Sequence, residues 1–158
     1  MADSERRFGP GEVDMLVTSY PGLVRFGTAS DAVSKDWIIK AEAALGLRLS
    51  ESYKWFLRTY AGGEIGGEEI YSLYGLEFGT AIGGDVVYQH LNGLKNGATT
   101  DSRLVVSETD FAEVFFFDYE RMTGDECPLL LQLSPTYVAH YADDFYEFLC
   151  KRIAAYTA

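Results

Sequence analysis

The first part of the chain places its hydrophobic residues at the spacing of amphipathic helices. A short helix is predicted to end before Pro21, because proline disfavours helical backbone in the preceding residue. Its hydrophobic face comprises Val13, Leu16, Val17 and Tyr20. A second helix is predicted to begin at Ser30 or Asp31, either of which can cap a helix N-terminus. Its inward-facing positions are expected to be Val33, Trp37, Ala41, Ala44 and Leu45.

A third helix follows closely, and its boundaries carry clear local signals. Gly46 suits the end of the second helix, and Ser50 suits the N-cap of the third. Hydrophobic residues then recur at helical spacing, at Tyr53, Phe56, Leu57 and Tyr60. The glycine-rich run GGEIGGEE, which begins at Gly62, is interpreted as a flexible turn that ends this helix and leads into a strand. That strand is expected to contain Ile70, Tyr71, Leu73 and Tyr74.

The second half of the chain changes to the pattern of short strands. Residues 80–95 suit a helix whose first turn is weakened by Gly83 and Gly84. Hydrophobic runs separated by turn residues then predict strands at 104–106, 114–118, 129–133 and 137–141. A final helix is predicted to begin at Asp143 or Asp144. One side of it is lined by Phe145, Phe148, Leu149, Arg152, Ile153 and Tyr156.

This order of elements predicts an α+β fold. Consecutive strands with short connections favour antiparallel pairing. We therefore expect a single domain with a mostly antiparallel sheet of about five to six strands and helices packed around it. Residues 1–28 are interpreted as an N-terminal leader and short helix of that domain, and residues 29–158 as its main part.

The composition adds a strong negative charge to this picture. The chain has 24 acidic and 13 basic residues, which gives a formal net charge of -11. Such a charge disfavours direct binding to nucleic acid or to an anionic membrane and favours a basic partner. An acidic surface also serves simply to keep a protein soluble, so the charge alone leaves both interpretations open.

The cellular location is predicted from features of the same sequence. The N-terminus has no hydrophobic run typical of a signal peptide, and no apolar stretch is long enough to span a membrane. Cys127 and Cys150 show no CxxC spacing and are expected to be buried thiols in a reducing compartment. These observations together predict a cytoplasmic protein.

Residue types that carry catalysis or bind metals are present, but not at the required spacings. The glycine-rich run lacks the Gly-Lys-Ser/Thr of a phosphate-binding loop, and no GxSxG elbow occurs. His90 and His140 do not form an HExxH motif, and we expect the first on a helix flank and the second on a strand. Adjacent carboxylates are typical of solvated turns. We therefore expect no enzyme activity, no metal and no cofactor.

The acidic residues are concentrated in two segments. One segment, from Glu108 to Glu126, contains Arg121 as its single Lys or Arg, and the other surrounds the glycine-rich turn. If the fold brings the two together, they form an acidic concave face in which tyrosines act as anchors. Otherwise they are separate solvated edges. The candidate partner-binding residues are Glu64, Glu68, Glu69, Tyr71, Asp118, Tyr119, Glu120, Asp125 and Glu126.

The stretch EAALGLRLSESYKWFLRTYAGGEIGG resembles the signature of the SUKH superfamily. In that pattern an acidic residue and Leu-Gly end one helix, L-P-x-x-Y-x-x-F-L begins the next, and glycines precede a strand. The matching positions are Glu42, Leu45, Gly46, Leu49, Tyr53, Phe56, Leu57, Gly62 and Gly63. Ser50 stands where the pattern has proline, and either residue can begin a helix. The runs GDECPLLLQL and DDFYEFLCKRI are similar to the last strands and helix of the family, so the resemblance extends from about Asp31 to Tyr156.

The SUKH superfamily includes a yeast cell-wall regulator and many bacterial immunity proteins of polymorphic toxin systems. The resemblance implies an α+β domain without enzyme activity that binds and neutralises a cognate toxin domain. A basic nuclease is the expected toxin, because an acidic face fits a basic cleft. A second interpretation is a protein-interaction or regulatory scaffold of the same fold. A third is an enzyme or small-ligand binder with a pocket beside the glycine-rich turn.

Overall fold

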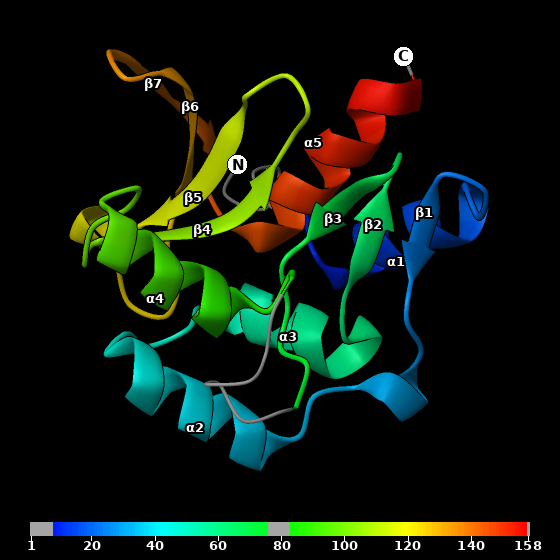
Figure 1. The fold of residues 1–158 in the computed structure, drawn as a ribbon. Helices are drawn as coiled ribbons and strands as arrows, with labels where there is room; N and C mark the ends of the chain where they lie inside the picture. The colour runs from blue at the N-terminus through cyan, green and yellow to red at the C-terminus, as the bar shows by residue number, and fades with distance from the viewer. Residues whose placement is uncertain (1–7, 76–82, 158) are drawn as a thin grey trace.

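A computed structural model describes residues 8–75 and 83–157 of the chain. The helices are α1 (Pro10–Ser19), α2 (Lys35–Leu45), α3 (Glu51–Tyr60), α4 (Val86–Asn96) and α5 (Phe145–Thr157), with 3-10 helices η2 (Ala29–Asp31) and η3 (Tyr119–Arg121). The strands are β1 (Val24–Phe26), β2 (Gly63–Ile65), β3 (Glu68–Ile70), β4 (Arg103–Glu108), β5 (Val114–Asp118), β6 (Leu129–Ser134) and β7 (Tyr137–Ala142). Figure 1 shows this arrangement, which confirms the predicted α+β class.

The strands are divided between two antiparallel sheets, where one sheet of five to six strands was expected. One sheet has the order β1-β2-β3, and the other has the order β4-β5-β6-β7. The sheets meet where β3 ends, because the backbone N–H of Tyr71 donates to the carbonyl oxygen of Val106 at 2.8 Å. Ser107 Oγ also donates to the carbonyl oxygen of Glu69, at 3.0 Å. The predicted antiparallel pairing is confirmed in both sheets.

The glycine-rich run forms part of a β-hairpin, which corrects its interpretation as a flexible turn. Gly66 and Gly67 connect β2 to β3 with φ angles of 61° and 86°, which glycine adopts readily. Gly63 has a φ angle of 145°, and a Cβ atom there would lie 2.2 Å from the carbonyl oxygen of Arg25 in β1. Glycine at this position therefore lets β1 pair closely with β2. The strand predicted for residues 70–74 ends at Ile70, and its continuation makes one bridge, from Ser72 to Asp85.

Helix α2 begins later than predicted. Residues 29–31 form η2, and the helix starts only after Ser34, whose Oγ accepts a hydrogen bond from the backbone N–H of Trp37 at 3.2 Å. This shift of the N-cap also changes the buried face. Trp37 is half-buried and Ala44 is exposed, while the buried residues of the helix are Ile38, Ala41 and Leu45.

The other internal helices begin at polar caps. Ser50, Asp85 and Asp144 each accept hydrogen bonds from backbone N–H groups in the first turn of α3, α4 and α5. The caps of α3 and α5 confirm the predictions from sequence. Helix α4 begins at Val86, after Gly83 and Gly84, and the predicted first residues 80–82 lie outside the described part of the chain.

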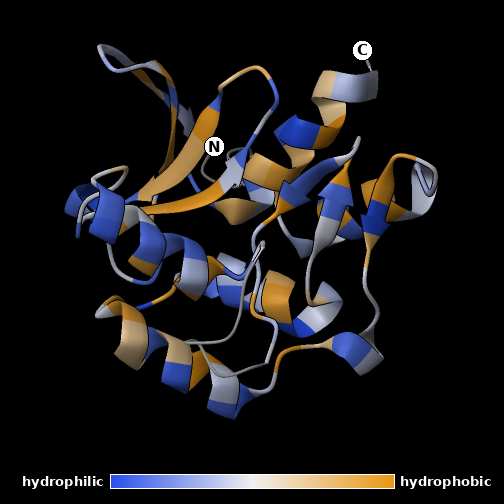
Figure 2. Cartoon of the chain, in the orientation of Figure 1, coloured by the Kyte–Doolittle hydropathy of each residue, from blue (hydrophilic) through white to orange (hydrophobic). Residues whose placement is uncertain are grey.

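The core lies around helix α5. Its first turns pack against β5, with the ring of Phe145 stacked on that of Phe117 at a centroid distance of 5.8 Å. Helix α3 adds Tyr53, whose ring centroid lies 4.8 Å from that of Phe145. Figure 2 shows that β4 and β5 are strongly hydrophobic, as this burial requires. Within residues 8–75 and 83–157, no helix combines the length and apolar character needed to cross a bilayer.

Candidate functional site

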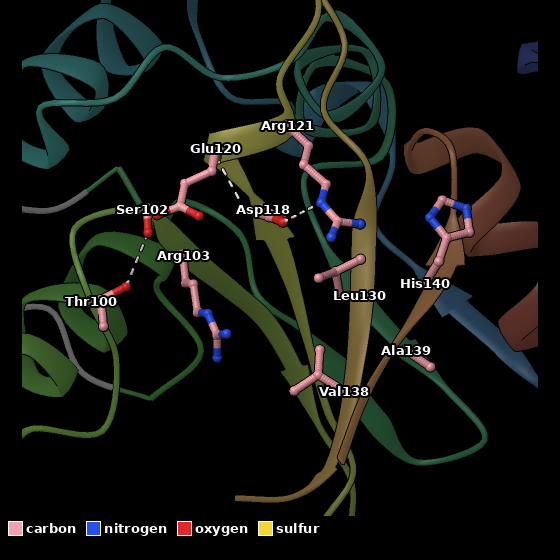
Figure 3. A pocket seen from close by; sticks show the side chains of 10 residues that line it. All are labelled: Thr100, Ser102, Arg103, Asp118, Glu120, Arg121, Leu130, Val138, Ala139 and His140. Atoms are coloured by element: carbon pink, nitrogen blue, oxygen red, sulfur yellow. Dashed lines mark hydrogen bonds and ion pairs between the residues drawn. The ribbon is translucent and has the colours of Figure 1, made fainter. Parts of the chain in front are cut away.

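A groove of about 580 Å³ lies on the face of the four-stranded sheet that points away from α5 (Figure 3). Phe115 and Phe117 face α5, and side chains alternate along a strand, so Phe116 and Asp118 point to the opposite face. The residues that line the groove are Thr100, Ser102, Arg103, Asp118, Glu120, Arg121, Leu130, Val138, Ala139 and His140.

The groove carries charges of both signs. Arg121 Nε lies 3.4 Å from Asp118 Oδ2, and Asp118 Oδ1 accepts a hydrogen bond from the backbone N–H of Glu120 at 3.1 Å. The guanidinium of Arg103 lies 4.5 Å from the ring centroid of Phe116. Figure 3 shows Asp118 between Arg103 and Arg121 in this view. The groove is therefore a mixed-charge surface that suits contact with polar or charged groups of another molecule.

The acidic residues of the β2–β3 hairpin are placed in three different ways. Glu64 and Glu69 are directly paired across β2 and β3, an arrangement in which like charges destabilise a sheet. Arg25 is the partner of Glu64 on β1, and Glu69 Oε2 accepts a hydrogen bond from the hydroxyl of Tyr74 at 3.1 Å. Glu69 is exposed and Glu64 is half-buried. Glu68 instead forms an ion pair with Arg152 of α5, so its carboxylate already has a partner within the fold.

The two tyrosines predicted as anchors are turned into the protein. Tyr71 is buried, and this burial raises the pKa of its hydroxyl to about 12. Tyr119 is half-buried, its hydroxyl oxygen has no hydrogen-bond partner, and burial raises its pKa well above the ordinary value. Neither ring is presented at the surface as a free aromatic anchor would be.

The turn before β6 has one surface acid and one structural acid. Asp125 is exposed, and its Oδ1 lies 3.5 Å from Nη1 of Arg48. Glu126 accepts hydrogen bonds from the backbone N–H of Ser52 at 2.9 Å and from its hydroxyl at 2.6 Å. Glu126 therefore satisfies the N-terminus of α3, where free N–H groups need acceptors. Burial raises the pKa of this carboxyl despite the two hydrogen bonds.

The acidic residues of the β2–β3 hairpin and those around η3 do not form one concave face. Figure 1 shows the β2–β3 hairpin and η3 on opposite sides of β4 and β5. Of the nine candidate residues, Asp118 and Glu120 line the groove. The acids that remain at or near the surface are Glu64, Glu69, Glu120 and Asp125, and their role in binding stays a prediction. Glu77, a further acid that follows the glycine-rich run in the sequence, lies outside the described residues.

The groove contains three basic groups that were not among the binding residues predicted from the sequence. Arg103, Arg121 and His140 come from β4, η3 and β7, and pairing between strands brings them to one face. The register between β6 and β7 places Leu130 opposite His140, and this register is not determined by the pattern within either strand. Only the periodicity within each strand was available as a signal.

His90, Cys127 and Cys150 do not line the groove. His90 is buried in α4, which corrects its predicted place on a helix flank, and burial lowers its pKa. Burial raises the pKa of Cys127 to about 12 and that of Cys150 to about 11, so neither thiol is an activated nucleophile. Within residues 8–75 and 83–157, no group of three or more His, Cys, Asp or Glu side chains is placed to hold a metal ion.

These features define an α+β domain with an open, polar groove suited to binding. The chain belongs to the SMI1 / KNR4 family (SUKH-1), whose sequence profile matches residues 32–151. The match covers more than half of the chain and includes the helix boundary at Gly46 and Ser50. This family includes toxin immunity proteins and SMI1/KNR4-like proteins, is generally non-enzymatic, and interacts with partner proteins. The resemblance to the SUKH superfamily is thereby confirmed.

Proposed function

We propose that this protein is an immunity protein that binds and neutralises a cognate toxin domain in the cytoplasm. The observation that carries the proposal is the acid excess of the four-stranded sheet and its connections in a SUKH family member. Residues 103–142, which form β4 to β7 and their connections, contain two basic residues, Arg103 and Arg121. The acids of the same segment are Glu108, Asp110, Glu113, Asp118, Glu120, Asp125 and Glu126.

This charge favours a basic toxin, and a nuclease is the class we expect. A nuclease needs a basic cleft to hold the phosphate backbone. An acidic protein is attracted to that cleft from a distance, associates rapidly, and blocks access to the nucleic acid. Inhibition of this kind requires complementary surfaces and no chemical step, which agrees with the general character of the family.

The carboxylates available to a partner are fewer than the sequence suggests. Glu68 and Glu126 have partners within the fold, so reversing their charges would also disturb folding. Glu120 and Asp125 are exposed and lie on the connection between β5 and β6. They are therefore suitable positions for a test of the electrostatic contribution.

The first experiment is co-expression with the product of the gene that neighbours the gene for this chain. We expect the chain to restore growth and to bind the purified toxin domain, and lack of both effects would overturn the proposal. The double variant Glu120→Gln/Asp125→Asn is expected to associate more slowly at low ionic strength, because exposed charges steer encounter. Glu12→Gln/Asp36→Asn removes the same charge from the exposed surfaces of α1 and α2, and it serves as the control.

A protein-interaction or regulatory scaffold is the second candidate. The observation that favours it is the groove, where Arg103, Arg121 and His140 lie beside Asp118 and Glu120. A surface of both signs suits a partner of both signs, which differs from the strongly basic cleft of a nuclease. Binding to a neighbouring gene product without protection against any toxin would support this candidate over the first.

A further inference from the structure

Phe111 is the most exposed large hydrophobic side chain in residues 8–75 and 83–157. It lies in the connection between β4 and β5, and 82% of its surface is accessible to solvent. Single exposed hydrophobic residues are common on proteins, so exposure alone indicates little. The structure around Phe111 distinguishes it from the other exposed hydrophobic residues.

The connection that carries Phe111 is held in one conformation by Thr109. This threonine is buried. Its Oγ1 accepts hydrogen bonds from the backbone N–H groups of Phe111 at 3.2 Å and Glu113 at 3.3 Å. The same hydroxyl donates a hydrogen bond to Glu113 Oε1 at 3.0 Å. Ala112 adopts a φ angle of 63°, which non-glycine residues adopt rarely. An aromatic residue on an ordered loop loses little conformational entropy on binding, which is the property of an anchor.

Two further exposed hydrophobic side chains lie at the same end of the sheet. The strand order β4-β5-β6-β7 is antiparallel, so the β4–β5 and β6–β7 connections lie at the same end (Figure 1). Leu133 and Tyr137 flank the β6–β7 connection and are 46% and 53% exposed. We call Phe111, Leu133 and Tyr137, which lie on two separate connections, the turn patch. Phe111 and Tyr137 are aromatic, the kind of residue that is enriched in protein interfaces.

The charged residues that flank Phe111 in the sequence are all negative. Glu108 and Asp110 are exposed, Glu113 is half-buried, and residues 104–120 contain neither Lys nor Arg. A partner that covers Phe111 must therefore offer an apolar pocket with Lys or Arg side chains at its rim. A second copy of this acidic chain lacks that complementarity, because it brings a net charge of -11 of its own.

We propose that the turn patch docks the toxin domain, with Phe111 inserted into an apolar pocket that is bordered by basic residues. This inference rests on the proposed function and names the anchor of the toxin-binding surface. It places the anchor at the opposite end of the four-stranded sheet from Glu120 and Asp125, which lie on the β5–β6 connection. Glu108 and Asp110 beside Phe111 then add to the steering of association by Glu120 and Asp125, while Phe111 sets the rate of dissociation.

The test measures binding of Phe111→Ala to the purified toxin domain encoded by the neighbouring gene. We expect Kd to rise more than about tenfold, mainly through faster dissociation, because a central aromatic anchor is a typical hot spot. Phe111→Leu is expected to retain part of the affinity. Met15→Ala is the control, since Met15 is 60% exposed on α1 and lies outside the turn patch.

The outcomes separate this inference from the proposed function. If the wild-type protein binds the toxin domain and the Kd of Phe111→Ala is within about twofold of the wild-type value, the docking role of Phe111 is overturned. The immunity function then still stands. Absence of wild-type binding overturns both. Conversion of a dimer to a monomer by Phe111→Ala, without loss of toxin binding, would assign the patch to self-association instead. A photo-crosslinking amino acid at position 111 gives an independent measurement, and we expect it to crosslink to the toxin domain.

Discussion

Arg152 of α5 and Glu68 of β3 form an ion pair in which Nη2 of the arginine lies 2.7 Å from Oε1 of the glutamate. The two residues are 84 positions apart in the sequence. The two side chains are only 9% and 12% exposed. The guanidinium of Arg152 also lies 4.6 Å from the ring centroid of Phe115 in β5. One arginine on α5 thus contacts both sheets, and the pair holds the β2–β3 hairpin against the helix.

Removal of Glu68 is expected to destabilise the protein strongly. Glu68→Ala leaves the guanidinium of Arg152 with little solvent and without its carboxylate partner. Removing one partner of a buried ion pair typically lowers the free energy of unfolding by about 3–5 kcal/mol. Urea denaturation of wild type and variant measures this difference.

The control is the double variant Glu68→Leu/Arg152→Met, which removes both charges. Replacement of a buried ion pair by hydrophobic residues of similar volume is often neutral, so most of the stability should return. A loss of less than about 0.5 kcal/mol for Glu68→Ala would instead indicate a solvated pair of the surface type.

Phe56 and Phe111 allow the same substitution to be compared in the core and at the surface. Phe56 is fully buried in α3, so Phe56→Ala is expected to cost about 3–5 kcal/mol. Phe111→Ala is expected to stay within about 0.5 kcal/mol of wild type, because its side chain is exposed. Thermal and urea unfolding measure both values. Equal losses would show that the Phe111 ring packs against the domain, contrary to the exposure that the turn patch requires.

Ser52 joins three segments that are distant in the sequence. Its hydroxyl donates to Glu126 and accepts from the backbone N–H of Phe145 at 2.9 Å, so it links α3, the turn before β6 and the start of α5. Ser52→Ala would leave the Phe145 N–H without its acceptor, and we expect a loss of about 1–3 kcal/mol. Ser19→Ala, at an exposed position, is the matched control in urea denaturation. Equal stability of the two variants would argue against this role.

Features with a local signal were predictable from the sequence. The N-cap at Ser50 and the strand of residues 114–118 depend on neighbouring residues, and both were predicted where they occur. Strands β1 and β2 are three residues long and form through pairing with each other, so no periodicity within either segment indicates them. The division into two sheets follows from that distant pairing.

The candidate site was harder to predict for a related reason. A count of acidic residues does not distinguish a carboxylate with a partner from a free one. Glu68 and Glu126 find their partners in Arg152 and Ser52, 84 and 74 residues away. Glu120 has no such contact to a distant residue among the described hydrogen bonds and ion pairs, and it lines the groove. Tertiary contacts therefore decide which acids remain available to a partner.

His90 predicts how stability depends on pH. Its imidazole is buried in α4, Nδ1 has no hydrogen-bond partner, and burial lowers its pKa below the ordinary value of 6.5, although Asp101 opposes this shift. Below pH 6.5 the unfolded chain therefore binds a proton at this position that the folded chain does not. The stability from neutral His90 is fully present above pH 6.5 and is lost as the pH falls toward the folded pKa.

Two measurements check this expectation. NMR titration should show a pKa below 6.5 for the imidazole of His90. Urea denaturation between about pH 5 and 7.5 should show that His90→Gln removes part of the loss of stability at acidic pH, because glutamine does not titrate. If His90→Gln and wild type lose stability in parallel as the pH falls, His90 takes up its proton equally well in the folded protein, and its burial in α4 does not determine the acid sensitivity of the domain.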